Sequence, residues 1–495
     1  MARRKRIIVD CYTDEPAGLG VPPFLGVYPR YVAGRWTDPA TYLTIDDLRL
    51  HALWKKTGGR LPDFDPPEGK TRIDIINRTR SPEEVDQVLR SADRIFIIAG
   101  VQTPGKYLRA RPGTVREVLS LLRGLKCRLV LVGPAASGGT QLRGGTSPER
   151  FDPRAFEEIW ENVYEDYDEL RELALRGASI LRQIPDLRVV EIETGRGCPR
   201  SPGCSFCTEP LKGAVAWRRP EDVRAEVEAL WEHGARYFRL GKQSCLFSYS
   251  GGDTGKLKEL LEPLWRLGPC VLHIDNANPE MVTEERAALI VRYTTPGSTA
   301  ALGVESFDPE VRRANNLNAD VAQILEAVRI LNEVGSVRGE NGLPWLLPGI
   351  NILLGLVGET RETLEINLKQ LKEILAAGYL IRRINIRQVV PFPGTELARQ
   401  AGTKFLRKNR QLYARWIEQV RREVDLPMLK RVFPVGTVLR GLLSECHEGN
   451  VTFLRQPGSY PLIVGVRKRL PLGEFYDVRI TDHMLRSVVG EVVGD

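Results

Sequence analysis

The sequence predicts an α/β protein with three folded parts: an N-terminal doubly wound domain, a central α/β barrel and a small C-terminal β-barrel. Strand-like and helix-like segments alternate over residues 1–145 and again over 187–400, and five short strand-like segments with Gly-rich turns follow residue 431. Alternating strands and helices are typical of a parallel sheet with crossover helices, and closely spaced short strands are typical of a small barrel.

The domain boundaries follow these changes of pattern. We expect a Rossmann-like domain over 1–145, a helical linker over 146–186, the barrel over 187–400, a basic helical linker over 401–430 and the small barrel over 431–495. A chain of 495 residues is long enough for two to four domains, which agrees with the three folded parts predicted here.

The N-terminal domain is predicted from its apolar runs and one helix start. Ser81 precedes a proline and two glutamates, which is typical of an N-cap followed by an acidic first turn. A helix broken by proline is expected over Leu19–Gly34. The expected strands are Arg6–Cys11, Arg72–Asn77, Arg94–Ala99 and Arg128–Gly133. Their alternation with helices argues for a doubly wound sheet.

Cys198, Cys204 and Cys207 form a C-x5-C-x2-C cluster on a loop rich in Gly and Pro, directly after a strand-like run. Three thiolates at this spacing can bind three irons of a cubane iron–sulfur cluster and leave the fourth iron open. Zinc also takes thiolates but would need a fourth ligand, for which His233 and Cys245 are the nearest candidates. Because α/β barrels carry their chemistry at the carboxyl ends of strands, we expect the functional site on this loop.

The barrel region resembles the radical S-adenosylmethionine (radical SAM) superfamily. Phe206 lies directly before the last cysteine, where the family's C-x3-C-x2-C triplet also has an aromatic residue, although the first gap here is five residues. The segments GVES (303–306), GLVGET (355–360) and PFPGTEL (391–397) follow in the order in which the family places similar motifs. The resemblance implies a partial (β/α)6 TIM-like barrel. Its expected strands are Leu187–Glu193, Ala235–Leu240, Cys270–Asp275, Ala301–Ser306, Ile350–Thr360 and Ile384–Arg387.

The resemblance also implies the cofactors. The three cysteines would ligate a 4Fe–4S cluster whose open iron binds the amino and carboxylate groups of S-adenosylmethionine. Reduction by a donor such as ferredoxin or flavodoxin would cleave the sulfonium and give a 5′-deoxyadenosyl radical. Phe206 would lie against the adenine, Glu305 and Ser306 near the ribose or methionine moiety, and the segment from Gly355 through Glu359 would form a wall on the adenine side. No residue is assigned a catalytic role.

One family motif is missing. The Gly-Gly-Glu that often follows the second strand and holds the amino group of S-adenosylmethionine is replaced here by residues 240–245. Gln243 could accept a hydrogen bond from that amino group, and Lys242 could instead contact the carboxylate or be solvated.

The N-terminal domain resembles the cobalamin-binding-type domain that precedes the barrel in many radical SAM proteins, and residues 18–23 are similar to its early loop. The histidine loop that ligates cobalamin is missing, since His51 reads as part of a helix. Cobalamin is therefore disfavoured, and histidine-free sites in the family keep it as an alternative. Methylthiotransferases have three cysteines here for a second cluster, whereas this chain has Cys11 and Cys127, for which a structural role is favoured.

The C-terminal segment predicts an oligonucleotide-binding-like barrel. Its expected strands are Val435–Leu443, Asn450–Leu454, Tyr460–Val466, Glu474–Ile480 and Leu485–Val492. The region resembles a TRAM domain, which follows the radical SAM barrel in tRNA methylthiotransferases and binds RNA there.

The distribution of charge indicates the same partner, RNA. The chain carries a formal charge of +8, and residues 378–422 contain eleven Lys and Arg against two Glu. Phe405, Tyr413 and Trp416 interleave with these cations, and residues 467–469 form a second basic cluster. Basic stripes with aromatics suit phosphates and stacked bases, while a solvated helix face is the plain alternative.

We therefore expect a radical SAM enzyme that modifies RNA, with tRNA as the partner. The alternatives are a radical SAM enzyme that acts on a protein or a small metabolite, and a non-catalytic RNA-binding iron–sulfur protein. No apolar run is long enough to span a bilayer, and the N-terminus lacks the pattern of a signal peptide. Eight cysteines with one tight triplet suit a metal protein in a reducing compartment, so we expect a cytoplasmic protein without a membrane partner.

Overall fold

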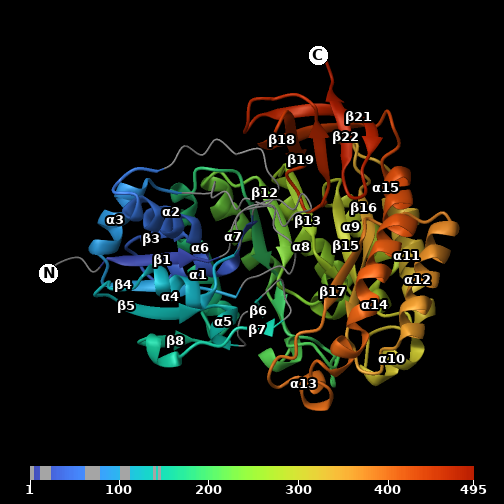
Figure 1. Cartoon of the computed structure of the whole chain (residues 1–495), viewed down its shortest axis with the longest axis horizontal. Coiled ribbons are helices and arrows are strands. Elements are labelled where there is room, and N and C mark those ends of the chain that lie inside the picture. The colour runs from blue at the N-terminus through green and yellow to red at the C-terminus, as the bar shows by residue number, and fades with distance from the viewer. Residues whose placement is uncertain are drawn as a thin grey trace. The chain divides into compact units, whose positions relative to one another are not determined.

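The computed structural model describes residues 5–11, 24–61, 79–100, 112–137, 141–142 and 147–494 (Figure 1). The chain forms two compact units, the first made of Met1–Gly18, Pro23–Val190 and Ala225–Ala235 and the second of Leu19–Pro22, Glu191–Arg224 and Arg236–Asp495. The strand expected at 72–77 and the loop at 18–23 lie outside the described residues. In the described part of the chain, no helix is long and apolar enough to cross a membrane.

The first unit contains a parallel sheet of five strands in the order β3-β1-β4-β5-β8. The strands are β1 (Arg6–Asp10), β3 (Thr41–Thr44), β4 (Arg94–Ile98), β5 (Arg128–Val132) and β8 (Glu158–Trp160). Counted along the chain, this is the 2-1-3-4-5 order of a doubly wound fold, as predicted. The sequence did not indicate β3 and β8, because each is too short to show an apolar run.

Helices cover both faces of this sheet, and the strand sequences explain why. Successive residues of β1 alternate between two buried clusters, with Ile7 and Val9 in one and Ile8 in the other. Strands buried on both faces read as continuous apolar runs, which made them recognisable. The covering helices are α1 (Val27–Ala33), α2 (Ile45–Lys56), α3 (Pro82–Arg90), α4 (Val115–Leu121) and α6 (Tyr167–Gly177). Strand β8 and helix α6 come from the stretch predicted as a linker.

Local capping sets the start of two of these helices. Ser81 caps α3 as predicted: its hydroxyl accepts the Glu84 N–H, and the Glu84 carboxylate accepts the Ser81 N–H. Thr44 and Asp47 form the same capping box at α2. Such reciprocal bonds satisfy backbone donors that the helix itself leaves free.

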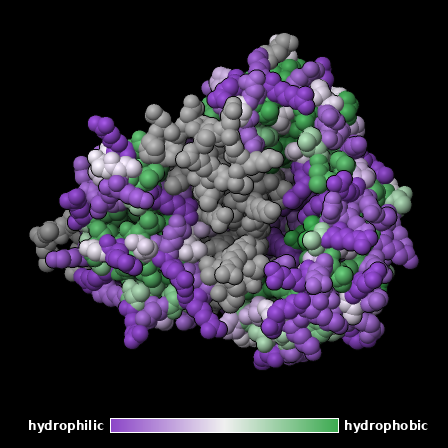
Figure 2. Space-filling view, viewed as in Figure 1, coloured by the Kyte–Doolittle hydropathy of each residue, from purple (hydrophilic) through white to green (hydrophobic). Residues whose placement is uncertain are grey.

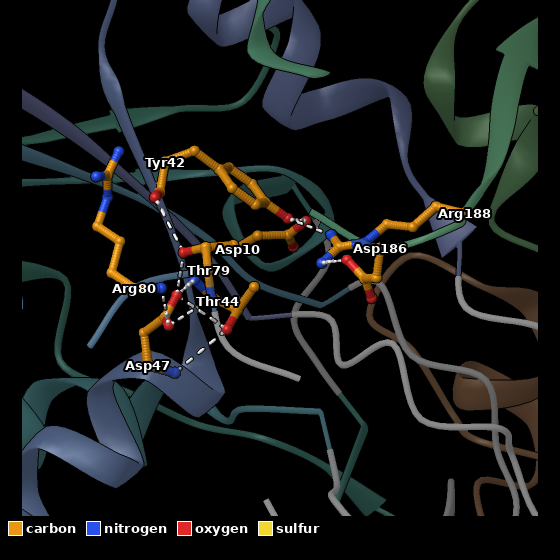
Figure 3. A network of polar contacts seen from close by, with 8 residues as sticks. All are labelled: Asp10, Tyr42, Thr44, Asp47, Thr79, Arg80, Asp186 and Arg188. Carbon is orange, nitrogen blue, oxygen red and sulfur yellow. Dashed lines mark hydrogen bonds and ion pairs between the residues drawn. The ribbon is translucent and has the colours of Figure 1, made fainter. Parts of the chain in front are cut away.

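A buried polar network holds the ends of β1 and β3 together (Figure 3). The Tyr42 hydroxyl donates to Asp10 Oδ2 at 3.1 Å and accepts from Arg188 Nη1 at 3.0 Å. Arg188 Nη2 also donates to Asp186 Oδ1 at 3.2 Å. Two carboxylates therefore balance a guanidinium that is only 5% exposed, as a buried charge requires.

The second unit begins with a partial barrel whose six strand positions follow chain order: β9-β12-β13/β14-β15-β16-β17. β13 pairs with β12 and the next segment, β14, pairs with β15, so the two share one position. The strands are β9 (Val189–Glu193, in this unit from Glu191), β12 (Tyr237–Gly241), β13 (Val271–Ile274), β14 (Asn276–Ala277), β15 (Ser298–Glu305), β16 (Leu346–Leu354) and β17 (Ile384–Gln388). The partial (β/α)6 barrel is confirmed. Helices α8 (Thr254–Arg266), α9 (Glu284–Arg292), α11 (Val321–Gly335) and α12 (Arg361–Ala376) connect its strands, and α14 (Lys404–Val420) follows the last.

The C-terminal segment closes into a five-stranded barrel in the order β18-β19-β20-β22-β21. Its strands are β18 (Val438–Glu448), β19 (Val451–Arg455), β20 (Ile463–Val466), β21 (Phe475–His483) and β22 (Val488–Val492). All five predicted strands are present. The first begins three residues later than predicted, after a turn in which Gly436 has a φ of +91°.

A buried histidine joins the small barrel to the partial barrel. His273 Nδ1, on β13, accepts the Ser459 N–H at 3.0 Å and lies 2.8 Å from the Ser459 hydroxyl. Since Nδ1 is an acceptor, the ring proton is on Nε2, which lies 3.3 Å from the Pro296 carbonyl. Gly458 is required beside it, because a Cβ there would be 2.5 Å from the imidazole.

This histidine predicts a pH-dependent stability. Burial lowers the pKa of His273 to about 3, so the folded protein holds it neutral where the unfolded chain, with a pKa near 6.5, takes up a proton. Stability therefore falls as pH drops below 6.5, by about 1.4 kcal/mol per unit down to the folded pKa. In His273→Asn, whose amide oxygen can accept the same Ser459 donors, this component should vanish in urea unfolding between pH 7.5 and 4.5. His447→Asn controls for the replacement, and an unchanged pH dependence in His273→Asn would contradict the prediction.

Candidate functional site

The cysteine loop begins where β9 ends and is closed at its base by a short ribbon. β10 (Gly195–Arg196) pairs antiparallel with β11 (Ala216–Trp217). Gly195 is needed because a Cβ would lie 2.5 Å from the Trp217 ring, and Gly197 adopts a φ of +78°. The ribbon thus holds the cysteine loop at the carboxyl end of the first barrel strand, as expected.

The three thiols form one electrostatic cluster. Burial raises the pKa of Cys207 to about 12 and raises that of Cys204, and the charge of Cys198 adds to both shifts. Arg200 Nη1 lies 3.2 Å from Cys204 Sγ and acts in the opposite sense, and the Glu209 N–H donates to Cys207 Sγ at 3.4 Å. N–H donors to sulfur and a nearby guanidinium suit thiolates bound to iron. The donor set therefore fits a 4Fe–4S cluster.

A single metal ion fits less well. Within the ranges that the structure describes, no three His, Cys, Asp or Glu side chains gather closely enough to hold one ion. Cys245, considered as a zinc ligand, is buried and accepts the Asn278 N–H on its sulfur at 3.1 Å. In a cubane each thiolate binds a different iron, so the thiols need not converge on one point.

Asn315 ties the cysteine loop to the loop after β16. Its Oδ1 accepts from the Ser205 hydroxyl at 2.7 Å and from the Val357 N–H at 3.1 Å. Its Nδ2 donates to the carbonyls of Val357 and Val311, both at 2.8 Å, and its own carbonyl accepts the Ser205 N–H at 2.9 Å. This fully buried side chain thus joins the two loops predicted to hold the cluster and the cofactor.

Asn316 secures the other side of the cysteine loop. Its Nδ2 donates to the carbonyls of Pro202 at 2.6 Å and Gly203 at 3.1 Å, and its carbonyl accepts from Arg200 Nη1 at 2.9 Å. Asn316 adopts a φ of +49°, a region that asparagine tolerates better than most residues. The sequence showed these asparagines without revealing their role, because that role depends on burial.

Glu305 is the predicted cofactor residue with the most distinctive environment. It ends β15 with a φ of +63°, and burial raises its pKa to about 7 against the opposing charges of Arg387 and Arg312. Its charge also contributes to the raised pKa of Cys204, so it lies near the cluster site. Among the described residues its carboxylate has no hydrogen-bond or ion-pair partner, and a strained, half-buried acid of this kind suits a ligand contact.

Ser306 and Glu359 are already occupied by the protein. Ser306 Oγ donates to Asn367 Oδ1 at 3.3 Å and accepts the Asp308 N–H at 3.2 Å. Glu359 accepts the N–H of Gly355 at 3.0 Å on one oxygen. Its other oxygen accepts from two side chains of α14, Asn409 and Tyr413. We therefore assign Ser306 and Glu359 positioning roles, with Glu359 holding the turn at Gly355, where φ is +90°.

Phe206 packs against an apolar cluster of the protein, and its contact with adenine stays a prediction. The cluster consists of Val311, Leu317, Leu353, Leu356, Val389 and Leu397. Leu406, from the first turn of α14, packs against the same cluster and brings that helix to the site.

Gln243 retains the unsatisfied acceptor that its predicted role needs. It is 2% exposed, and its Nε2 is 3.4 Å from the Leu240 carbonyl. Its Oε1 and the Ser244 hydroxyl are buried without a partner in the described part of the chain. Such a buried acceptor costs free energy unless a ligand supplies a donor. Lys242, by contrast, already has a partner within the protein.

The N-terminal cysteines cannot share a second cluster. Cys11 follows the carboxyl end of β1, whereas Cys127 precedes the amino end of β5, and the strands of this sheet are parallel. The two thiols therefore lie at opposite edges of the sheet. His51, on α2, lies with its Nε2 3.0 Å from Asp86 Oδ1 of α3, so it makes a structural contact between two helices.

Two of the three aromatic residues predicted to face nucleic acid, Tyr413 and Trp416, are buried, so the prediction was wrong for them, whereas Phe405 is half-buried. Tyr413 and Trp416 are 3% and 4% exposed. The Tyr413 hydroxyl donates to Glu359, and Trp416 Nε1 donates to the Leu364 carbonyl at 2.7 Å. Together with Val420 they form the helix face that packs inward, which leaves the cations on the opposite face.

Comparisons with known proteins identify the class. A model of the Radical SAM superfamily matches residues 192–371. A ribosomal protein uS12 methylthiotransferase, RimO, of Nocardioides sp. is 29% identical over 195 residues, 38% of each chain. The solved structure of the radical SAM methyltransferase TsrM from Kitasatospora setae aligns with a TM-score of 0.48 and 15% identity, covering 80% of this chain and 75% of that one. The chain belongs to the radical SAM superfamily and is an enzyme of that class.

A full-length relative places it more narrowly. An uncharacterized protein of Methanocaldococcus jannaschii is 42% identical over 541 residues, which cover 99% of this chain and 94% of that protein. The chain therefore belongs to the same family as this protein.

The Asn315 contacts predict a specific defect. Asn315→Leu removes the hydrogen bonds that join the two loops, each worth about 1 kcal/mol, so S-adenosylmethionine affinity should fall by roughly 10- to 100-fold. Iron content after anaerobic reconstitution should stay near that of the wild type, because the thiols remain. Asn332→Leu is the matched control, since Asn332 bonds Val328 and Leu380 in the same pattern away from the cysteine loop. An equal loss of affinity in both variants would refute the assignment.

The orphan acceptor of Gln243 gives a second test. Gln243→Leu should weaken S-adenosylmethionine binding by about tenfold, and Gln243→Glu should restore it because a carboxylate also accepts from an amino group. Equilibrium dialysis of labelled S-adenosylmethionine measures both. Gln456→Leu, at a buried glutamine that donates to the Tyr460 carbonyl, is the control. Unchanged affinity in Gln243→Leu would exclude this side chain from the cofactor site.

Proposed function

We propose that this radical SAM enzyme reductively cleaves S-adenosylmethionine in order to modify RNA, with tRNA as the substrate. The observation that carries the RNA assignment is the cationic face of α14, whose first turn packs beside the cysteine loop. A reductant such as ferredoxin or flavodoxin would supply the electron.

In this proposal the chain's own residues bind and orient the cofactors. Cys198, Cys204 and Cys207 hold the 4Fe–4S cluster, while Gln243 and Glu305 contact S-adenosylmethionine. When bound, the two groups supply one-electron cleavage of the sulfonium and a radical that abstracts a hydrogen atom. Three thiolates leave one iron without a protein ligand, which is the position that S-adenosylmethionine needs.

The cationic face of α14 supports a polyanionic substrate. Lys404, Arg407, Lys408 and Arg415 are exposed and share one side of the helix, opposite the buried aromatics. In the described residues none of the four pairs with a carboxylate. Hydrophilic side chains dominate the visible surface over α12 and α14 (Figure 2). Unpaired cations in a row are the arrangement that a phosphate backbone binds.

The C-terminal barrel supports the same substrate. Its five-stranded closed architecture and its resemblance to a TRAM domain suit RNA. Among the relatives is a tRNA-2-methylthio-N(6)-dimethylallyladenosine synthase of Leifsonia xyli, which is 26% identical over 209 residues.

A protein substrate is the second candidate. The similarity to RimO, named for its action on ribosomal protein uS12, favours it. The cations of α14 would then bind an acidic or RNA-associated protein. The two candidates differ in the macromolecule whose mass changes after turnover, which is tRNA for the first and a protein for the second.

The cleavage reaction is tested with dithionite and S-adenosylmethionine under anaerobic conditions. The reconstituted wild type should form 5′-deoxyadenosine, and Cys204→Ala should lose nearly all of that activity because one iron loses its thiolate. Cys270→Ala, at an exposed cysteine before β13, should match the wild type. Formation of 5′-deoxyadenosine by Cys204→Ala at the wild-type rate would contradict the assigned cluster.

The RNA assignment is tested by adding unmodified tRNA or purified ribosomal proteins to the same reaction. Nucleoside mass spectrometry should reveal a new modified nucleoside in tRNA that depends on S-adenosylmethionine and on Cys204. A mass change in a ribosomal protein, with unchanged tRNA, would replace the first candidate by the second.

A further inference from the structure

Four arginines gather at the amino end of β17. Arg382 and Arg383 directly precede the strand, Arg421 begins the π-helical turn Arg421–Asp425 after α14, and Arg486 lies between β21 and β22. Two chain segments and the small barrel thus meet here. We call these residues the arginine cluster.

Hydrogen bonds fix Arg421 and Asp425 directly beside Arg383. Arg421 Nη1 donates to the carbonyl of Ile384 at 2.8 Å, and Asp425 Oδ1 accepts the Ile384 N–H at 3.1 Å. Arg421 also forms an ion pair with Asp425. The carboxylate of Asp425 is therefore already used.

The charges of the cluster act on one another. Burial lowers the pKa of Arg383, and the charges of Arg382, Arg486 and Arg421 lower it further, whereas Asp425 opposes them. Partial desolvation of the Arg486 side chain lowers its pKa to about 10, and the charge of Arg421 lowers this pKa further. Asp275 acts on Arg382, and Asp425 acts on the other three arginines. Four guanidinium groups thus face two carboxylates, which leaves a positive excess that an anion would relieve.

Several donors in the cluster have no acceptor. Arg382 Nε and Arg383 Nη1 are buried without a hydrogen-bond partner among the described residues, and so is the Tyr460 hydroxyl. Burial raises the pKa of Tyr460, and the charges of both arginines oppose that shift. Arg486 is exposed and makes no ion pair in the part of the chain that the structure describes. The cluster therefore combines one exposed guanidinium with buried donors that lack acceptors.

We propose that the arginine cluster binds a phosphate group of an RNA backbone, at a site separate from the cofactor site. This inference rests on the proposed RNA substrate. Guanidinium groups offer paired N–H donors that match phosphate oxygens, and a phosphate would satisfy the free donors and the charge excess together.

Helix α14 connects this site to the chemistry. Its first turn contributes Leu406 to the apolar cluster under the cysteine loop, and its last residue precedes Arg421. A helix of 17 residues is about 25 Å long, enough for several phosphates to contact its cationic face. Beside Arg486, Met484 and Leu485 are 56% and 40% exposed and offer apolar contacts to a base or ribose. The RNA would thus run from the small barrel along α14 to the cysteine loop.

Salt-dependent RNA binding tests the site. Binding of fluorescent tRNA to the full-length protein is measured by anisotropy across a KCl series for the wild type, Arg486→Gln and Arg440→Gln. Losing one phosphate contact should weaken binding by about fivefold to tenfold and lower the slope of log affinity against log salt by about one in Arg486→Gln. Arg440→Gln, at an exposed arginine of the same small barrel paired with Asp477, should bind like the wild type. Equal slopes for Arg486→Gln and the wild type would overturn the proposal.

Inorganic phosphate separates this site from the proposed function. Phosphate should raise the thermal midpoint of the wild type and of Arg486→Lys but not of Arg486→Gln. Formation of 5′-deoxyadenosine without RNA should be unchanged in Arg486→Gln, because Arg486 is not part of the cofactor site. If phosphate stabilises the wild type and Arg486→Gln equally, the site is refuted. If tRNA does not bind the wild type while the phosphate effect depends on Arg486, the anion site stands and its assignment to RNA is overturned together with the RNA substrate.

Discussion

The attachment of the cysteine loop through Asn315 is the constraint on which the rest of the site depends. Beyond its short ribbon, the cysteine loop has no strand pairing to order it. Contacts with other parts of the protein must therefore offset the conformational entropy that the loop loses on folding. Asn315 does this by bonding the residue between Cys204 and Phe206 and, with the same amide, the loop after β16. The cluster and the cofactor must keep a fixed separation. One buried amide that bonds both loops keeps those loops at a fixed separation.

Other features around the cysteine loop follow from this arrangement. Arg312, one turn before Asn315, donates to the carbonyls of Val304, Ser306, Asn318 and Ala319. It thereby fixes the backbone on both sides of Glu305, which adopts a left-handed conformation. On the other side, Glu359 joins the Gly355 turn to α14. The same helix therefore supports the cofactor loop with its buried face and presents cations on its exposed face.

Most of the fold could be predicted because its strands are buried runs of apolar residues and the cysteine spacing is distinctive. The short β3 and β8 could not, since tertiary pairing rather than sequence pattern defines them. In α14 the sequence predicted a basic stripe with interleaved aromatics, whereas the structure buries two of those aromatics. Tyr413, Trp416 and Val420 lie at i, i+3 and i+7, which is the spacing of a core-facing stripe, so the helical period already argued against base stacking. Asn315, Arg312 and the arginine cluster escaped prediction because polar residues acquire such roles only through burial and through neighbours distant in sequence.

The direction of the barrel strands explains why a basic helix is suited to join two sites. The cysteine loop, Gln243 and Glu305 all lie at the carboxyl ends of strands, whereas Arg382 and Arg383 precede the amino end of β17. Five residues of strand separate these two edges by about 17 Å. The helix that follows a parallel strand returns in the opposite direction, so α14 starts at the edge with the chemistry and ends at the arginine cluster. Substrate contacts along α14 would therefore span both edges, and a polyanion held at Arg486 would be led toward the cysteine loop by the cations of the helix itself.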